Sequence, residues 1–161
     1  MQVIDRDSKL WEYLSDDIRG LLVDGEDLID HAMKHGGNAA SDFSYLVFPF
    51  AKSYEGFLKQ LFLDLDLIQE DEYYGDDIRI GRILNPHFTK DSKNIFGKLA
   101  EPKQAGENTA NLMWDVWKKG RNQVFHYFPH NFRRLSYADA VGLIHQFVFA
   151  MSAAVDSCPV C

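Results

Sequence analysis

Arg121 and His126 bring a permanent cation and a neutral-pH proton carrier together in Gly120-Arg121-Asn122-Gln123-Val124-Phe125-His126-Tyr127. A guanidinium can hold phosphate oxygens through two parallel hydrogen bonds, and an imidazole can accept or donate a proton near pH 7. Attack of a ribose hydroxyl on a phosphodiester benefits from both groups. The pair therefore indicates phosphodiester chemistry that needs no metal ion.

Spacing alone does not separate this motif from chance, because Arg82 and His87 repeat it. Pro86 interrupts any helix between those two residues, so no continuous helical backbone can hold them. In the other copy, Asn122 precedes His126 by four residues, so on a helix its amide can orient the imidazole ring. We take Arg121 as the phosphate-binding group, His126 as general acid or base and Asn122 as its orienting residue.

Each residue also has a purely structural interpretation. His126 could be a helical residue that packs among the aromatic residues beside it, its ring satisfied by a local partner. Arg121 could be a surface residue paired with Asp115 or Asp139. The basic, Asn-led context favours the functional interpretation of both.

The motif resembles the hallmark of the HEPN ribonuclease superfamily, an Arg, a polar residue, a few variable residues and a His on a helix of a small all-α domain. Tyr54-Glu55-Gly56-Phe57-Leu58-Lys59 is similar to the acidic position of the RNase LS toxin branch, bacterial toxins with anti-phage roles, where the Glu works with the motif Arg and His. The resemblance extends from about Asp42 to Ser157. Without it, Glu55 would be an ordinary helical acid paired with Lys52 or Lys59.

The resemblance implies a metal-independent endoribonuclease in which the ribose 2′-hydroxyl attacks the adjacent phosphodiester and leaves a 2′,3′-cyclic phosphate. It implies that Arg121 stabilises the transition state, that His126 transfers protons, and that Glu55 and Asn122 support them. It also implies a homodimer whose motif helices form a shared cleft, and a toxin held in check by an antitoxin protein. No cofactor and no metal site are expected.

The net charge of −7 argues against indiscriminate nucleic-acid binding, but the charges are unevenly distributed. No acidic residue occurs from Val116 through Ala138, and this basic segment contains the motif. A basic run is often only a solvated surface. Its coincidence with the motif predicts contacts to RNA from Lys118, Lys119, Tyr127, Arg133 and Arg134.

At 161 residues with 46% hydrophobic content, the chain is expected to form one domain over residues 1–161. The N-terminus is charged and shows no secretory signal, and the apolar stretch Val141–Val155 is interpreted as a core or interface helix. We expect a cytoplasmic protein with no membrane contact. Cys158 and Cys161 are expected to be free thiols on a flexible tail at 158–161, because a zinc site would need two more ligands.

Hydrophobic periodicity predicts an all-α bundle of about four main helices. The first runs from an N-cap at Ser8 to Gly36-Gly37, with a break near Gly20 or Gly25. The second begins after Ser41 or Asp42 and ends near Leu65. The third spans about 108–128 and ends before Pro129, and the fourth begins near Ser136. Residues 66–104 form an irregular insertion, with a short helix at 93–99 and a strand considered at 78–84.

Two other functions are consistent with the sequence. The runner-up is a non-catalytic helical module whose basic segment binds RNA or an acidic protein partner and whose Arg–His pair is structural. A divalent-metal nuclease ranks third, because the carboxylates do not cluster with the motif.

Overall fold

The computed structural model describes all residues except 35–39, 89 and 160, and the described residues contain helices and no strand. Four helical segments are long. They are α2 (Asp16–Lys34), α3 (Ser44–Asp64), α7 (Glu107–Val116) with the π-helix that continues it (Trp117–Asn122), and α8 (Tyr137–Ser157). The predicted all-α fold is confirmed.

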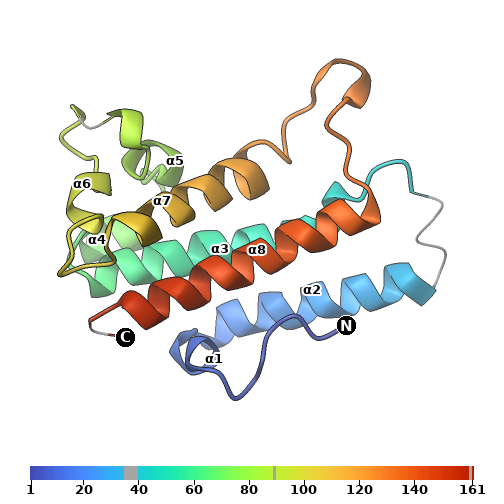
Figure 1. Ribbon diagram of the computed structural model, residues 1–161, viewed down its shortest axis with the longest axis horizontal. Coiled ribbons are helices and arrows are strands. Elements are labelled where there is room, and N and C mark those ends of the chain that lie inside the picture. The colour runs from blue at the N-terminus through green and yellow to red at the C-terminus, as the bar shows by residue number, and fades with distance from the viewer. Residues whose placement is uncertain (35–39, 89, 160) are drawn as a thin grey trace.

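Helix α3 is the centre of the bundle. It packs against α2 and α8, while α7 packs against α8 (Figure 1). A helix that is apolar on most of its surface must be buried by its neighbours, and α3 buries ten of its residues: Leu46, Val47, Phe50, Ala51, Ser53, Tyr54, Phe57, Leu58, Leu61 and Phe62. It therefore offers only a narrow surface to solvent, and Glu55 lies on that surface.

The predicted insertion between the second and third long helices consists of short elements. They are α4 (Glu70–Tyr74), α5 (Ile80–Ile83), a 3₁₀ helix (Pro86–Phe88) and α6 (Phe96–Leu99). The strand considered at 78–84 is wrong, because Ile80 and Ile83 bury the same side of a helical turn. The short helix predicted at 93–99 begins later, where the Asn94 side chain accepts the Phe96 N–H at 3.1 Å.

The predicted first helix is two helices, and its break was misplaced. Ser8 is the N-cap of α1 (Lys9–Tyr13), as predicted, but the chain becomes extended at Leu14 and α2 follows. Gly20 and Gly25 lie inside α2. Gly25 is required by packing rather than by chain reversal, because a Cβ there would lie 2.6 Å from the ring of Phe50. The predicted stop at 36–37 falls outside the described residues.

The third long helix ends earlier than predicted. The π-helix finishes at Asn122, and residues 123–126 form turns and a bend. Phe128 is extended, as expected before Pro129. The chain from 123 to 136 then stands out from the bundle as a tall loop before α8 (Figure 1).

The last helix begins as predicted. Ser136 is its N-cap, and a reciprocal pair of bonds with Asp139 forms a capping box. The position before α3 is different, because Phe43 occupies the N-cap and makes no side-chain cap bond. Asp42 instead accepts the Ser44 N–H at 2.9 Å, so its carboxylate satisfies a backbone donor in the first turn of α3.

The C-terminal tail differs from its prediction. Cys158 and Cys161 form a disulfide, and both pack against the core as half-buried residues. Neither is therefore a free thiol. Helix α8 is long and apolar enough to cross a membrane by length and composition. In this fold seven of its 21 residues are buried in the bundle.

Candidate active site

Glu55 and Arg121 form an ion pair between α3 and the π-helix. Arg121 Nε donates to Glu55 Oε2 at 3.4 Å. The Arg121 side chain is 40% exposed and the Glu55 side chain is 34% exposed. The guanidinium carbon also lies 5.6 Å from the Trp117 ring centre and 5.9 Å from that of Phe125. Within the described structure, Arg121 is not paired with Asp115 or Asp139. Glu55 is likewise not paired with Lys52 or Lys59, so both structural alternatives are wrong.

Two buried contacts fix the backbone beneath this pair. The Tyr54 hydroxyl donates to the Met113 carbonyl at 2.9 Å, which ties α3 to α7 next to Glu55. Burial raises the pKa of Tyr54, so its hydroxyl stays a donor. Gly120 lies so close to Phe147 of α8 that a Cβ would come within 2.4 Å of the ring. The motif glycine thus lets the π-helix approach α8 and places Arg121 opposite Glu55.

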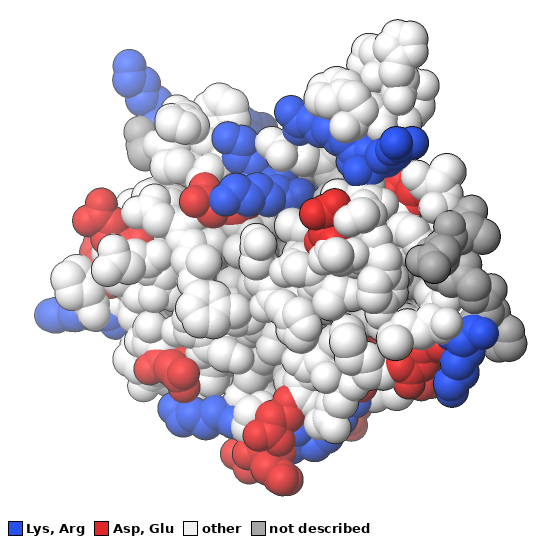
Figure 2. Space-filling view, turned by 45° about the vertical axis from the view of Figure 1, so that its right-hand side comes forward, with Lys and Arg blue, Asp and Glu red and all other residues white. Residues whose placement is uncertain are grey.

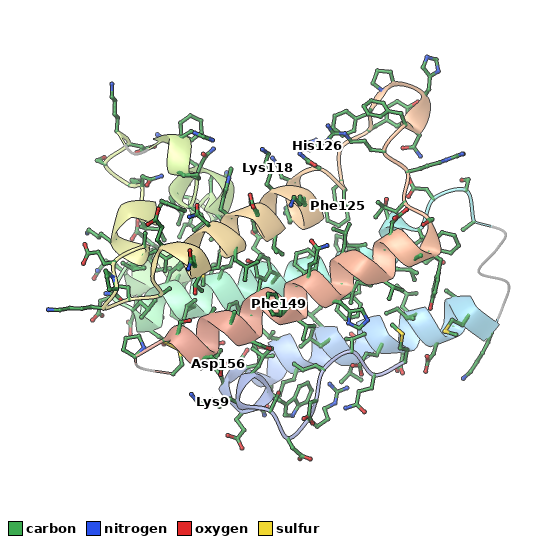
Figure 3. All side chains as sticks on the ribbon, in the orientation of Figure 1. Lys9, Lys118, Phe125, His126, Phe149 and Asp156 are labelled. Atoms are coloured by element: carbon green, nitrogen blue, oxygen red, sulfur yellow. A yellow bond between two sulfur atoms is a disulfide. The ribbon has the colours of Figure 1, made fainter. Side chains whose placement is uncertain are left out.

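His126 lies beyond the end of the helix. Its Nε2 is 3.3 Å from Asn122 Oδ1, so the predicted contact between these residues is present. The prediction that Arg121 and His126 share one helix is wrong, because His126 is in a bend after the π-helix. His126 is exposed, and the packed interpretation of its ring is wrong as well. Figure 3 shows it with Lys118 at the upper edge of the molecule.

Two clefts meet at the Glu55–Arg121 pair. The first, of about 700 Å³, lies between α2, α3, α4 and the turn after the π-helix, and Lys52, Lys59 and Phe125 are among its lining residues. The second, of about 780 Å³, lies beside α5. Of the described residues, only Glu55 and Arg121 line both, so the ion pair is their common wall. Asn122 lines the second cleft, and His126 lines neither.

The side chains predicted to contact RNA are all on the surface. Lys118 and Lys119 extend from the π-helix, whereas Tyr127, Arg133 and Arg134 are on the tall loop, and all five are exposed. Figure 2 shows basic side chains along the upper edge, with acidic ones among them and a largely uncharged surface below. None of these five residues lines either of the two clefts.

The tall loop is fastened at its base by Asp42. The Asp42 carboxylate accepts the Asn131 side-chain amide at 2.9 Å and the Leu135 N–H at 3.1 Å. Burial alone would raise the pKa of Asp42, but hydrogen bonds from Ser44, Asn131 and Leu135 outweigh it and lower the pKa to about 2. His130 and Asn131 both have positive φ, at 60° and 48°, so the tip makes a tight reversal. Arg133 covers the Phe128 ring at 4.1 Å.

Sequence reasoning missed the residues of α3 that surround Glu55. Phe48, Lys52, Glu55 and Lys59 follow one another at intervals of four, three and four residues, and all four line the first cleft. This spacing is typical of one face of a helix. The signal could have been found as three charged residues, Lys52, Glu55 and Lys59, on one face of an otherwise apolar helix. The π-helix and the packing of Gly120 on Phe147 had no comparable signal.

Among the described residues, no three His, Cys, Asp or Glu side chains gather as a ligand set. Comparison of the chain with protein-family models, curated proteins and solved structures finds no match. The site must therefore be interpreted from its own chemistry.

Proposed function

We propose that the protein is a metal-independent endoribonuclease of the HEPN type. The observation that carries the proposal is the Glu55–Arg121 pair at the junction of two clefts, with the Asn122–His126 pair directly after it in the chain. A cation at the wall between two clefts can hold the phosphate of a strand that occupies both sides. Glu55 fixes the guanidinium through Nε, and the described residues make no hydrogen bond to its two Nη groups.

The proposed reaction is a transesterification within the RNA strand. The 2′-oxygen forms a bond to phosphorus, the bond from phosphorus to the 5′-oxygen breaks, and a 2′,3′-cyclic phosphate remains on the 5′ fragment. His126 accepts the 2′-hydroxyl proton or supplies a proton to the departing 5′-oxygen. With Nε2 donating to Asn122 Oδ1, the neutral ring keeps its lone pair on Nδ1. Arg121 stabilises the charge on the pentacoordinate phosphorus.

The test is RNA cleavage in excess chelator, compared between wild type and His126→Ala. His145→Ala is the matched control, because His145 is an exposed histidine of α8 that lines neither cleft. We expect cleavage with cyclic-phosphate ends from wild type and His145→Ala, and none from His126→Ala. Persistent cleavage by a folded His126→Ala variant, or restoration of lost activity by Mg²⁺ or Zn²⁺, would overturn the assignment.

We further propose a symmetric homodimer with the 108–128 segment near its two-fold axis. Its support is the family resemblance together with two exposed aromatic residues of the tall loop, Tyr127 and Phe132, which are 79% and 66% exposed. Two basic segments repel each other unless apolar contacts compensate, so bound RNA should strengthen the dimer. A monomer by light scattering at tens of micromolar, with full activity, would contradict this arrangement.

The resemblance also supports a biological role as a toxin that a cognate antitoxin protein neutralises in the cytoplasm. Expression of wild type should inhibit growth, and His126→Ala should not. Growth inhibition by the inactive variant would separate the toxin role from RNA cleavage.

A second function, a non-catalytic module that binds RNA or a protein partner, is favoured by one observation. His126 is exposed and lines neither cleft, so the proposed proton-transfer group lies outside the cavities whose wall contains Arg121. Tight RNA binding without cleavage by wild type would establish this alternative.

A further inference from the structure

The first cleft combines an apolar interior with charged side chains at its border. Ile18, Leu21 and Ala51 supply aliphatic surface, and Phe48, Tyr73 and Phe125 supply three aromatic rings. Its volume of about 700 Å³ is in the range of small-molecule and nucleotide sites. Phe48 and Phe125 meet edge to face at 5.7 Å, and 56% of Phe48 is exposed, so a ring face at the opening is available to a ligand.

The charged residues of this cleft distinguish a nucleotide from a purely apolar ligand. Lys52, Lys59 and Arg121 outnumber Asp17 and Glu55 along its lining, although the whole chain is acidic. An apolar ligand would make no polar contact with the ammonium groups of Lys52 and Lys59. A planar base joined to a phosphate matches both the aromatic rings and the excess of positive charge, since bases stack on aromatic side chains irrespective of sequence.

The order of these groups along α3 gives the ligand a direction. Phe48, Lys52, Glu55 and Lys59 run along one face of the helix, and Arg121 faces Glu55 from the π-helix. A base on Phe48 would put its own phosphate near Lys52 and the Glu55–Arg121 wall. The second cleft, with Arg79, Phe88 and Asn122, continues beyond that wall.

We propose that the first cleft is a base-binding subsite for single-stranded RNA, in which Phe48 stacks the nucleotide next to the phosphate held by Arg121. This inference rests on the proposed function and deepens it. It assigns Phe48 and Lys52 as binding residues that the motif does not contain. It also makes the substrate single-stranded, because a base in a duplex cannot enter the cleft without leaving its stack.

The experiment measures binding without cleavage. A short 2′-O-methyl oligoribonucleotide lacks the attacking hydroxyl, and 2-aminopurine at every second base reports stacking by loss of its fluorescence. We expect wild type to quench the fluorescence, and Phe48→Ala to weaken binding about 10-fold and abolish most of the quenching. Phe149→Ala is the matched control, because Phe149 is a 64% exposed phenylalanine of α8 outside both clefts.

Lys52→Ala supplies a second measurement that does not depend on Phe48. We expect weaker binding and a shallower dependence of affinity on salt, because one phosphate contact is lost.

Equal affinity and equal quenching in wild type and Phe48→Ala would overturn the inference, as would binding of a mononucleotide as tightly as the oligonucleotide. Binding by this route with no cleavage of ordinary RNA would refute the nuclease and leave the subsite standing. Cleavage of ordinary RNA by Phe48→Ala at the wild-type rate would support the nuclease and overturn the base-binding subsite.

Discussion

The two ends of the motif differ in how firmly the fold holds them. Arg121 lies on a π-helix that packs on α8, is paired with Glu55 and is about half-buried. His126 is exposed on a bend, and within the described part of the chain its side chain makes one hydrogen bond, to Asn122. A spacing of five residues in the sequence therefore does not by itself hold Arg121 and His126 in a fixed relative position. Packing and the ion pair fix the position of the Arg121 guanidinium, whereas the position of His126 depends on the conformation of the chain after the helix.

The largest expected effect tests whether the anchored end acts as a unit. Arg121→Ala should lower the cleavage rate by about 10²–10³-fold, because it removes the cation at the wall between the clefts. Glu55→Gln should lower it less, and the double variant should be no slower than Arg121→Ala alone. Initial rates under single-turnover conditions measure this. Asp115→Asn, an exposed acid of α7, should cleave like wild type. Multiplying effects in the double variant would show that the two residues act independently.

The next effect concerns stability rather than rate. Gly120→Ala should lower the free energy of unfolding by about 1–3 kcal/mol, because its methyl group would overlap the Phe147 ring. Gly142→Ala is the control, since a Cβ there meets nothing within 4 Å and alanine favours a helix. Denaturant unfolding of both variants measures the difference. Equal stabilities would mean that the close approach of the π-helix to α8 does not hold Arg121 in place.

A smaller loss is expected where α3 meets α7. Tyr54→Phe should lower the free energy of unfolding by about 1 kcal/mol, because the fully buried hydroxyl no longer bonds the Met113 carbonyl. Thermal unfolding of Tyr13→Phe is a useful comparison, since its hydroxyl bonds the Asp64 carboxylate at the exposed side of α3. A loss at Tyr54 no larger than at Tyr13 would show that the buried bond is not a special anchor.

The smallest effect concerns the loop at the exposed end. The folded pKa of Asp42 is lowered from 3.8 to about 2, so its contribution to stability is complete above the unfolded pKa and is lost as pH falls towards 2. Asp42→Asn should therefore be less stable than wild type at pH 6, and the difference should be smaller at pH 2.5 because part of the contribution is then lost. Paired urea titrations at the two pH values measure it. A gap that stays constant would contradict the role of the Asp42 carboxylate at the loop.

How far the sequence predicted the fold depends on which elements are compared. The apolar periodicity of 44–64 and 137–157 gave helices close to their observed bounds, because long amphipathic or buried helices leave a strong repeat. The strand considered at 78–84 and the break considered near Gly20 or Gly25 were wrong. A short apolar run fits either type of structure, and a glycine such as Gly25 can serve packing instead of a turn. The family resemblance and the activity remain proposals.

The chemical groups can be read from the amino-acid sequence alone: an Arg, an Asn and a His in one short segment, a distant Glu, and a basic stretch in an acidic chain. Local hydrogen-bonding chemistry also determined the caps at Ser8 and Ser136, which need only neighbours along the chain. Only the tertiary structure decided that Glu55 pairs with Arg121, that two clefts meet at that pair and that His126 falls beyond the helix. Those outcomes depend on contacts between residues far apart in sequence, and no local pattern records which side chains the packing will bring together.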